Sequence, residues 1–199
     1  MSEETYELVK VPSDVLKQTA HAVEKIDSDI QAQIEKMTRT MYRDSGIGLA
    51  ANQVGILNRI FVMDLPDHSW EFGEEKDGVH QIIGTYRSGE SEFEPGKNLK
   101  AFINPEIVSE SQTKSVYEEG CLSIPGAYAE VVRPSKVKVR YQNEQGSTVM
   151  EEFEGLHAHC VQHEIDHLNG VLFIDYLSSL KRNMILKKMK KLNKDASVL

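Results

Sequence analysis

The spacing of apolar residues predicts a helix near the amino terminus, over residues 28–43. Its apolar residues recur at steps of four and three, which is the period of an amphipathic helix. They are Ile26, Ile30, Ile34, Met37 and Met41. Ser28 and Gln31 stand three residues apart at the start, so we expect them to form a capping box.

Short β-like runs fill the middle of the chain, and two more helices are predicted near its end, at 156–168 and 178–192. The runs are 59–64, 101–108, 114–117, 129–133, 136–141 and 148–153. In residues 136–141 polar and apolar side chains alternate strictly, which is typical of a half-buried strand. Strands flanked by helices predict an α+β fold. We expect mixed or antiparallel sheets packed around the helix 156–168, with an amphipathic C-terminal helix.

Residues 65–100 break this pattern. They are rich in glycine, proline and acidic residues, and they predict a long surface insertion with a short hairpin at 79–86. A loop of this length is uncommon inside a compact domain. The length of 199 residues suits one domain. We therefore expect a single catalytic domain over 1–199, with the insertion at 65–100 and a C-terminal helix and tail at 178–199.

Composition narrows the classes of protein. The net charge of −8 gives no sign of broad affinity for nucleic acid, so we expect no DNA partner. Two cysteines are too few for a disulfide scaffold. The polar, acidic start lacks the pattern of a signal peptide, and no apolar run of ~18 residues predicts a membrane span. We expect a cytoplasmic enzyme with reduced thiols and no membrane partner.

The strongest chemical signal is the helical segment His163-Glu164-Ile165-Asp166-His167. Histidines at i and i+4 lie one turn apart on one helix face, where a single ion can reach both. Glu164 stands where a general base is expected. The segment predicts a metal-dependent amide hydrolase. A chance His-x-x-x-His is the alternative.

A helical projection of residues 156–168 indicates that this helix runs through the core. Leu156, Cys160, His163 and His167 fall on one stripe. A second apolar stripe, on the opposite side, holds Ala158, Val161, Ile165 and Leu168. Buried histidines need partners, because an unpaired buried polar group costs a few kcal/mol. A metal ion would supply them.

The third ligand is sought by elimination, since a catalytic ion of this type usually has three protein ligands and a water. Phe173 stands where the longer HExxHxxGxxH motif has its third histidine. No glutamate follows Glu164, and Asp175 and Asp195 are weak options. His159 lies ~12 Å from His167 along the axis, too far to share an ion.

The two cysteines remain as third ligand. Cys160 lies on the histidine stripe, although it also suits a small apolar wall residue. Cys121 follows a strand candidate and precedes Leu-Ser-Ile-Pro, so it can be aimed at a helix crossing beneath. Spacing favours Cys121 and leaves Cys160 open.

Three segments together resemble one family, peptide deformylase. Residues 46–53 match its motif GxGxAAxQ, residues 119–123 match EGCLS, and residues 163–167 match HExDH, in the family's order. The resemblance implies that Cys121, His163 and His167 bind one divalent metal ion. It implies Fe²⁺ as the native ion, with Zn²⁺, Ni²⁺ or Co²⁺ in its place in some preparations.

The resemblance implies an activity: removal of the formyl group from the N-terminal formyl-methionine of newly made bacterial or organellar polypeptides. A hydroxide generated at the ion would attack the formyl carbon. Glu164 would act as general base and acid. The side-chain amide of Gln53 and the backbone N–H of Leu122 would stabilise the oxyanion.

The same resemblance implies how N-formylmethionyl nascent peptides bind. Backbone around Ile47, Gly48 and Gly120 would pair with the extended substrate. An apolar pocket would take the methionine side chain; its residues are Ile47, Tyr117, Leu156, Cys160 and His163. The family often has arginine where this chain has Tyr128, so contacts beyond the first substrate residues are expected to differ.

The C-terminal helix carries a dense set of cations. They are Lys181, Arg182, Lys187, Lys188, Lys190, Lys191 and Lys194, against a single acid, Asp195. A basic helix on an acidic protein would suit ribosomal RNA, so we consider a ribosome-docking role. A solvated face on a docked helix is the plain alternative.

The sequence argues against three other functions. Residues 46–51 fit a loose dinucleotide-binding pattern, but they follow a helix and open a strand, the reverse of the required order. A general metalloprotease lacks its downstream ligands here. A non-catalytic ribosome-associated protein would be expected to have lost Glu164, Gln53 or a ligand, and all are present.

Overall fold

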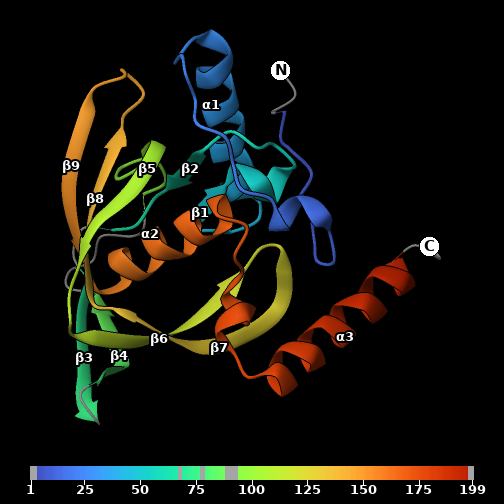
Figure 1. Cartoon of the computed structure of the whole chain (residues 1–199), viewed down its shortest axis with the longest axis vertical. Helices are drawn as coiled ribbons and strands as arrows, with labels where there is room; N and C mark the ends of the chain where they lie inside the picture. Colours follow the sequence, from blue (N-terminus) through green and yellow to red (C-terminus); the bar gives the residue numbers. More distant parts are fainter. Residues whose placement is uncertain (1–3, 67–68, 77–78, 88–93, 197–199) are drawn as a thin grey trace.

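The computed structural model describes residues 4–66, 69–76, 79–87 and 94–196. The helices, in chain order, are η1 (Asp14–Lys17), α1 (Ser28–Arg43), η2 (Ala51–Val54), α2 (Gly155–Leu168), η3 (Phe173–Tyr176) and α3 (Ser179–Ala196), η marking 3-10 turns. The strands are β1 (Gly48–Ala50), β2 (Ile60–Met63), β3 (Ser69–Lys76), β4 (Val79–Arg87), β5 (Lys100–Glu110), β6 (Lys114–Cys121), β7 (Ile124–Pro134), β8 (Lys136–Gln142) and β9 (Thr148–Glu154). This α+β architecture confirms the predicted fold class (Figure 1).

Helix α1 has the predicted bounds, but its cap differs from the prediction. The side chain of Asp27 accepts hydrogen bonds from the backbone N–H groups of Asp29 and Ile30, at 3.2 and 3.3 Å. The capping box predicted from Ser28 and Gln31 is therefore wrong. A carboxylate one residue earlier takes the N-cap position, where it also favours the positive end of the helix dipole.

The first sheet has five strands in the order β1-β2-β5-β8-β9, and every pairing is antiparallel. Its inner face packs on α2 through a cluster of aromatic rings. The rings of Phe61 and Phe102 stack with centroids 4.3 Å apart, and Tyr141 and Phe153 adjoin Phe102. Burying this apolar surface fixes α2 against the sheet.

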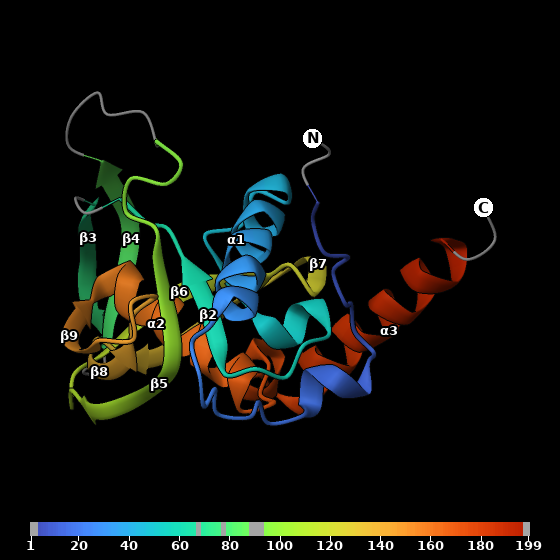
Figure 2. The same ribbon diagram turned by 90° about the horizontal axis from the view of Figure 1, so that it is seen from above.

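The second sheet has the order β3-β4-β6-β7 and is mixed. Strands β4 and β6 run parallel, whereas the pairs β3–β4 and β6–β7 are antiparallel. The hairpin predicted within 79–86 is wrong, since residues 79–87 form one strand whose hairpin partner is β3. The pairing of β4 with β6 links segments far apart in the sequence, which local patterns do not reveal. The β3–β4 hairpin and α3 lie at opposite ends of the molecule (Figures 1 and 2).

Helix α2 lies between the two sheets and contacts strands of both (Figure 1). Its position confirms the predicted central helix. Helix α1 covers β1 and β2. The C-terminal helix α3 contacts η3 and β7, and its Met189 is buried there in a third cluster with Phe173 and Ile174. Within the described ranges, no helix combines the length and apolar content that a membrane crossing requires.

Candidate metal centre

Three elements bring the predicted site residues together. Helix α2 supplies His163, Glu164 and His167, strand β6 ends at Cys121, and η2 carries Gln53. The pairing of β6 with β7 shifts register after Gly120. Such irregularities re-aim side chains at strand ends. Here the shift turns the last residue of β6 toward α2.

One atom each from Cys121, His163 and His167 forms a compact group in which all lie within 4.8 Å of one another. The Sγ atom of Cys121 is 3.2 Å from Nε2 of His167. A thiolate with two imidazoles is a donor set for borderline-soft ions such as zinc or iron. The three residues therefore fit a single divalent metal ion.

Cys160, the other predicted candidate for the third ligand, stands outside this group within the described residues. Burial, and to a smaller extent the nearby charge of Glu164, raises the pKa of the Cys160 thiol well above its usual value. A thiol that keeps its proton is a poor ligand, because metals bind the thiolate. Cys160 instead lines the cleft.

His167 is 1% exposed, and burial holds its pKa well below the ordinary value. The ring is therefore neutral, which is the form that ligates metals. Its Nδ1 atom is buried and has no hydrogen-bond partner among the described residues, whereas Nε2 faces Cys121.

Glu119 orients the other histidine. Its Oε2 atom accepts a hydrogen bond from Nδ1 of His163 at 2.8 Å, which leaves Nε2 of that ring for a metal. Burial alone would raise the pKa of Glu119, but hydrogen bonds from His159, His163 and Arg133 hold it far below its usual range. The carboxylate therefore stays ionised, and it fixes the tautomer of the ring.

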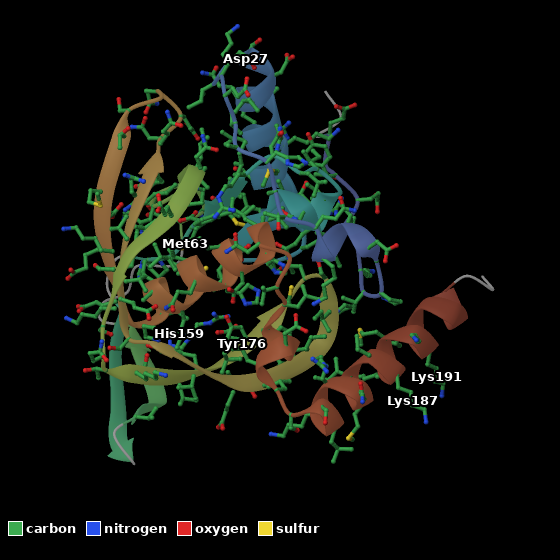
Figure 3. The ribbon with its side chains drawn as sticks, viewed as in Figure 1. Asp27, Met63, His159, Tyr176, Lys187 and Lys191 are labelled. Atoms are coloured by element: carbon green, nitrogen blue, oxygen red, sulfur yellow. The ribbon has the colours of Figure 1, made fainter. Side chains whose placement is uncertain are left out.

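Arg133 anchors Glu119 from behind. Its Nε and Nη2 atoms donate to the two carboxylate oxygens of Glu119, at 2.5 and 3.0 Å. Its Nη1 atom donates to Asp166 at 2.7 Å, and its guanidinium lies over the ring of Tyr176, 4.7 Å from the centroid. The bidentate geometry is one that lysine cannot reproduce. Figure 3 shows Tyr176 and His159 near α2 and the second sheet.

Glu164 is 4% exposed, and its Oε2 atom has no hydrogen-bond partner among the described residues. Burial raises the pKa of Glu164 to about 7. A Cβ atom added at Gly48 would lie only 2.5 Å from Oε1 of Glu164. The bare backbone of β1 thus allows the carboxylate to lie directly beside it.

Gln53 is 1% exposed, and its side-chain amide has a fixed direction. Its Oε1 atom accepts a hydrogen bond from the backbone N–H of Ala50 at 2.8 Å. The Nε2 atom consequently points the other way and lies 3.4 Å from Sγ of Cys121. The amide thus presents donors beside the ligand group.

A cleft of about 570 Å³ opens over this group. All six predicted substrate-binding residues line it, namely Ile47, Gly48, Tyr117, Gly120, Leu156 and Cys160. Gln53, Cys121, Leu122, His163 and Glu164 also line it. The exposed ring of Tyr128 lies across Gly120, its partner in the β6–β7 ladder, at the rim of the cleft.

Sequence reasoning did not identify the Glu119–Arg133 pair beside the ligand group or the cleft-lining residues Leu8 and Lys10. A signal for Glu119 exists, because Ser115, Tyr117 and Glu119 alternate along β6 and all three are buried. Period-2 alternation could therefore have marked Glu119 as inward-facing.

An α+β fold that places a Cys-His-His group and a buried carboxylate in an open cleft defines a metal-dependent hydrolase. Residues 5–183 match the family model described as polypeptide deformylase. The chain belongs to the peptide deformylase family and is an enzyme of that class.

Relatives and solved structures agree with this family. The chain is 48% identical over 192 residues to a peptide deformylase of Novosphingobium aromaticivorans, covering 96% of this chain and 98% of the relative. It is 45% identical to a peptide deformylase of Rhizobium meliloti, covering 92% of this chain and 91% of that relative. The crystal structure of an Ehrlichia chaffeensis peptide deformylase superposes with a TM-score of 0.80 at 36% identity, covering 98% of this chain and all of that one.

Proposed function

We propose that this enzyme removes the formyl group from the N-terminal formyl-methionine of newly synthesised polypeptides, and that the whole chain acts as one catalytic domain. One observation carries the proposal: the ligand group, the Glu164 carboxylate and the Gln53 amide all meet at a single cleft. Hydrolysis of a small amide needs a nucleophile, a base and an oxyanion site. Glu164 and Gln53 would supply the base and the oxyanion site, and the ligand group would hold the ion that activates the nucleophile.

The ion itself is proposed to be Fe²⁺, held by Cys121, His163 and His167. When bound, it would lower the pKa of a water molecule and polarise the formyl oxygen. Zn²⁺, Ni²⁺ or Co²⁺ would also suit one thiolate and two imidazoles.

Glu164 is proposed as the proton carrier. Its carboxylate would accept a proton from the attacking water and deliver it to the methionine nitrogen as the C–N bond breaks. The buried, unpartnered Oε2 atom suits this role, since it is available for a proton and shielded from competing solvent.

Gln53 and Leu122 are proposed as donors to the oxyanion. The Gln53 amide is already turned toward Cys121 by its bond from Ala50, so little reorganisation would be needed when charge develops on the formyl oxygen. The Leu122 N–H follows directly after Cys121 in the chain. Both groups belong to residues that line the cleft.

The substrate is proposed to bind as an extended strand between the backbones at Gly48 and Gly120. Backbone N–H and C=O groups along these two segments would pair with the substrate backbone, as when a strand is added to a sheet edge. Its methionine side chain would enter an apolar pocket, whose walls are formed by Ile47, Tyr117, Leu156, Cys160 and His163.

We also propose that α3 docks the enzyme on the ribosome in the bacterial cytoplasm, where formylated chains emerge. Lys187 and Lys191 are exposed and project from α3 (Figure 3). Binding to ribosomes should weaken steeply with salt, because phosphate contacts release counterions. Charge reversal at Lys187 and Lys191 should abolish it without changing turnover of a free peptide. Equal ribosome binding by that variant would contradict this docking role.

The proposed reaction is tested by offering three substrates to the enzyme purified anaerobically with its metal. They are a formyl-Met peptide, the acetyl-Met counterpart and a longer peptide with internal amides only. We expect formate release from the first and negligible cleavage of the other two. Cleavage of internal amides would indicate a general metalloprotease instead.

A further inference from the structure

A segment near the amino terminus, residues 8–11, forms hydrogen bonds with two separate parts of the proposed active site. The backbone N–H of Val9 donates to the carbonyl of Gln53 at 2.8 Å. The backbone N–H of Val11 donates to the carbonyl of Ser123 at 3.0 Å. One short segment therefore joins η2 to the turn between β6 and β7.

Each of these two carbonyls lies next to a proposed oxyanion donor. Gln53 supplies its own side-chain amide, and Ser123 directly follows Leu122. Ser123 is fully buried, and Gln53 is nearly so, so neither carbonyl has ready access to water in place of the segment's N–H. Losing either bond would leave a buried acceptor unpaired.

The side chains of the segment join two hydrophobic clusters. Val11 is 3% exposed and belongs to the cluster that contains Ile124. Leu8 packs on the cluster of α1, β1 and β2, which includes Leu49. Packing on both clusters restrains the segment at each end.

We infer that residues 8–11 act as a positioning strap that fixes the separation of Gln53 and Leu122. The inference rests on the oxyanion roles proposed above. Donors stabilise a transition state only when they are already aimed at it, so a loosened strap should cost turnover. The proposed substrate contacts at β1 and in the methionine pocket come from other elements, and a change confined to the Val9 backbone keeps the side chains of Leu8 and Lys10 that line the cleft, so KM should change little.

Replacing the Val9 amide by an ester tests the strap, because it deletes one N–H and keeps every side chain. The matched control is the same replacement at Glu7, an exposed residue just before the segment whose N–H has no backbone partner in the described ranges. We expect kcat to fall about tenfold for the Val9 ester, with KM changed less than about twofold and metal content unchanged. The Glu7 ester should match the parent.

A double-variant cycle separates positioning from general weakening. In a Gln53→Ala background the Val9 ester should have no further effect on kcat, because the amide that it positions is gone. A milder variant, Val9→Gly, keeps the N–H but loosens the segment, and its smaller loss of kcat should vanish in the same background. This variant serves if the ester chain does not fold.

The outcomes distinguish the strap from the proposed function. If the parent chain releases formate and the Val9 ester is as fast as the Glu7 ester, the strap is contradicted. The same holds if the losses from the ester and from Gln53→Ala simply add. If the parent chain releases no formate, the proposed function fails first.

Discussion

Glu119 and Cys121 stand two residues apart on β6, and both reach the same ligand group by different routes. Cys121 contributes its thiol directly, while Glu119 accepts the Nδ1 proton of His163 at 2.8 Å. One strand therefore supplies one ligand and orients another. Because Arg133 holds Glu119 with two hydrogen bonds, the orientation is anchored to β7 as well.

We expect Glu119→Gln to weaken metal binding between about ten- and a hundredfold, because a neutral amide holds the His163 ring less firmly than a carboxylate does. Competition with a chromogenic chelator measures the affinity. Glu130→Gln, an exposed acid on β7, is the matched control. Equal affinities for the two variants would show that Glu119 does not tune the site.

Arg133→Met should destabilise the fold by about 3–5 kcal/mol, since it leaves the buried Glu119 carboxylate without its bidentate guanidinium partner. Urea unfolding of the apo-protein measures the loss without a contribution from metal. The control is Arg140→Met, which removes an exposed pair with Glu106 and should cost below about 1 kcal/mol. Similar losses for both variants would argue against a special role for the buried pair.

Gly48→Ala should lower kcat by about a hundredfold while metal content stays constant. The added Cβ would lie 2.5 Å from Oε1 of Glu164, so the carboxylate must shift away from β1. Gly46→Ala meets mainly the movable end of the Leu122 side chain, and we expect a smaller loss. Steady-state kinetics on both variants checks the order, and a larger loss for Gly46→Ala would reverse the interpretation.

Removing the metal should abolish activity and lower the melting temperature, because an ion that binds only the folded chain stabilises it by mass action. Calorimetry before and after treatment with a chelator measures the shift. Adding back Fe²⁺ under anaerobic conditions should restore both properties. Cys121→Ser should show the lower melting temperature from the start, and an unchanged value would place the ion elsewhere.

The sequence predicted features that depend on local periodicity. The apolar spacing that marks α1 and the strict alternation in 136–141 both correspond to elements with nearly the predicted bounds. The two-stripe helix at 156–168 is indeed buried between the sheets.

Features that depend on long-range pairing escaped prediction. Strand β4 pairs in parallel with β6, a strand about 35 residues further along the chain. Arg133 reaches Glu119 only because β6 and β7 pair as neighbouring strands. The N-cap of α1 was assigned to Ser28 instead of Asp27, because both residue types are good caps and the two positions are adjacent. Spacing favoured Cys121 over Cys160 as the third ligand but could not decide between them. The decision depends on whether the end of β6 faces α2, which spacing does not reveal.

The central claim is that Glu164 moves the proton at a metal site built from Cys121, His163 and His167. Comparing Glu164→Ala with the parent chain tests it most directly, measuring metal content and formate release from a formyl-Met peptide on the same samples. We expect an equal metal content and a loss of turnover by at least about a hundredfold. Undiminished formate release by the metal-loaded variant would contradict it.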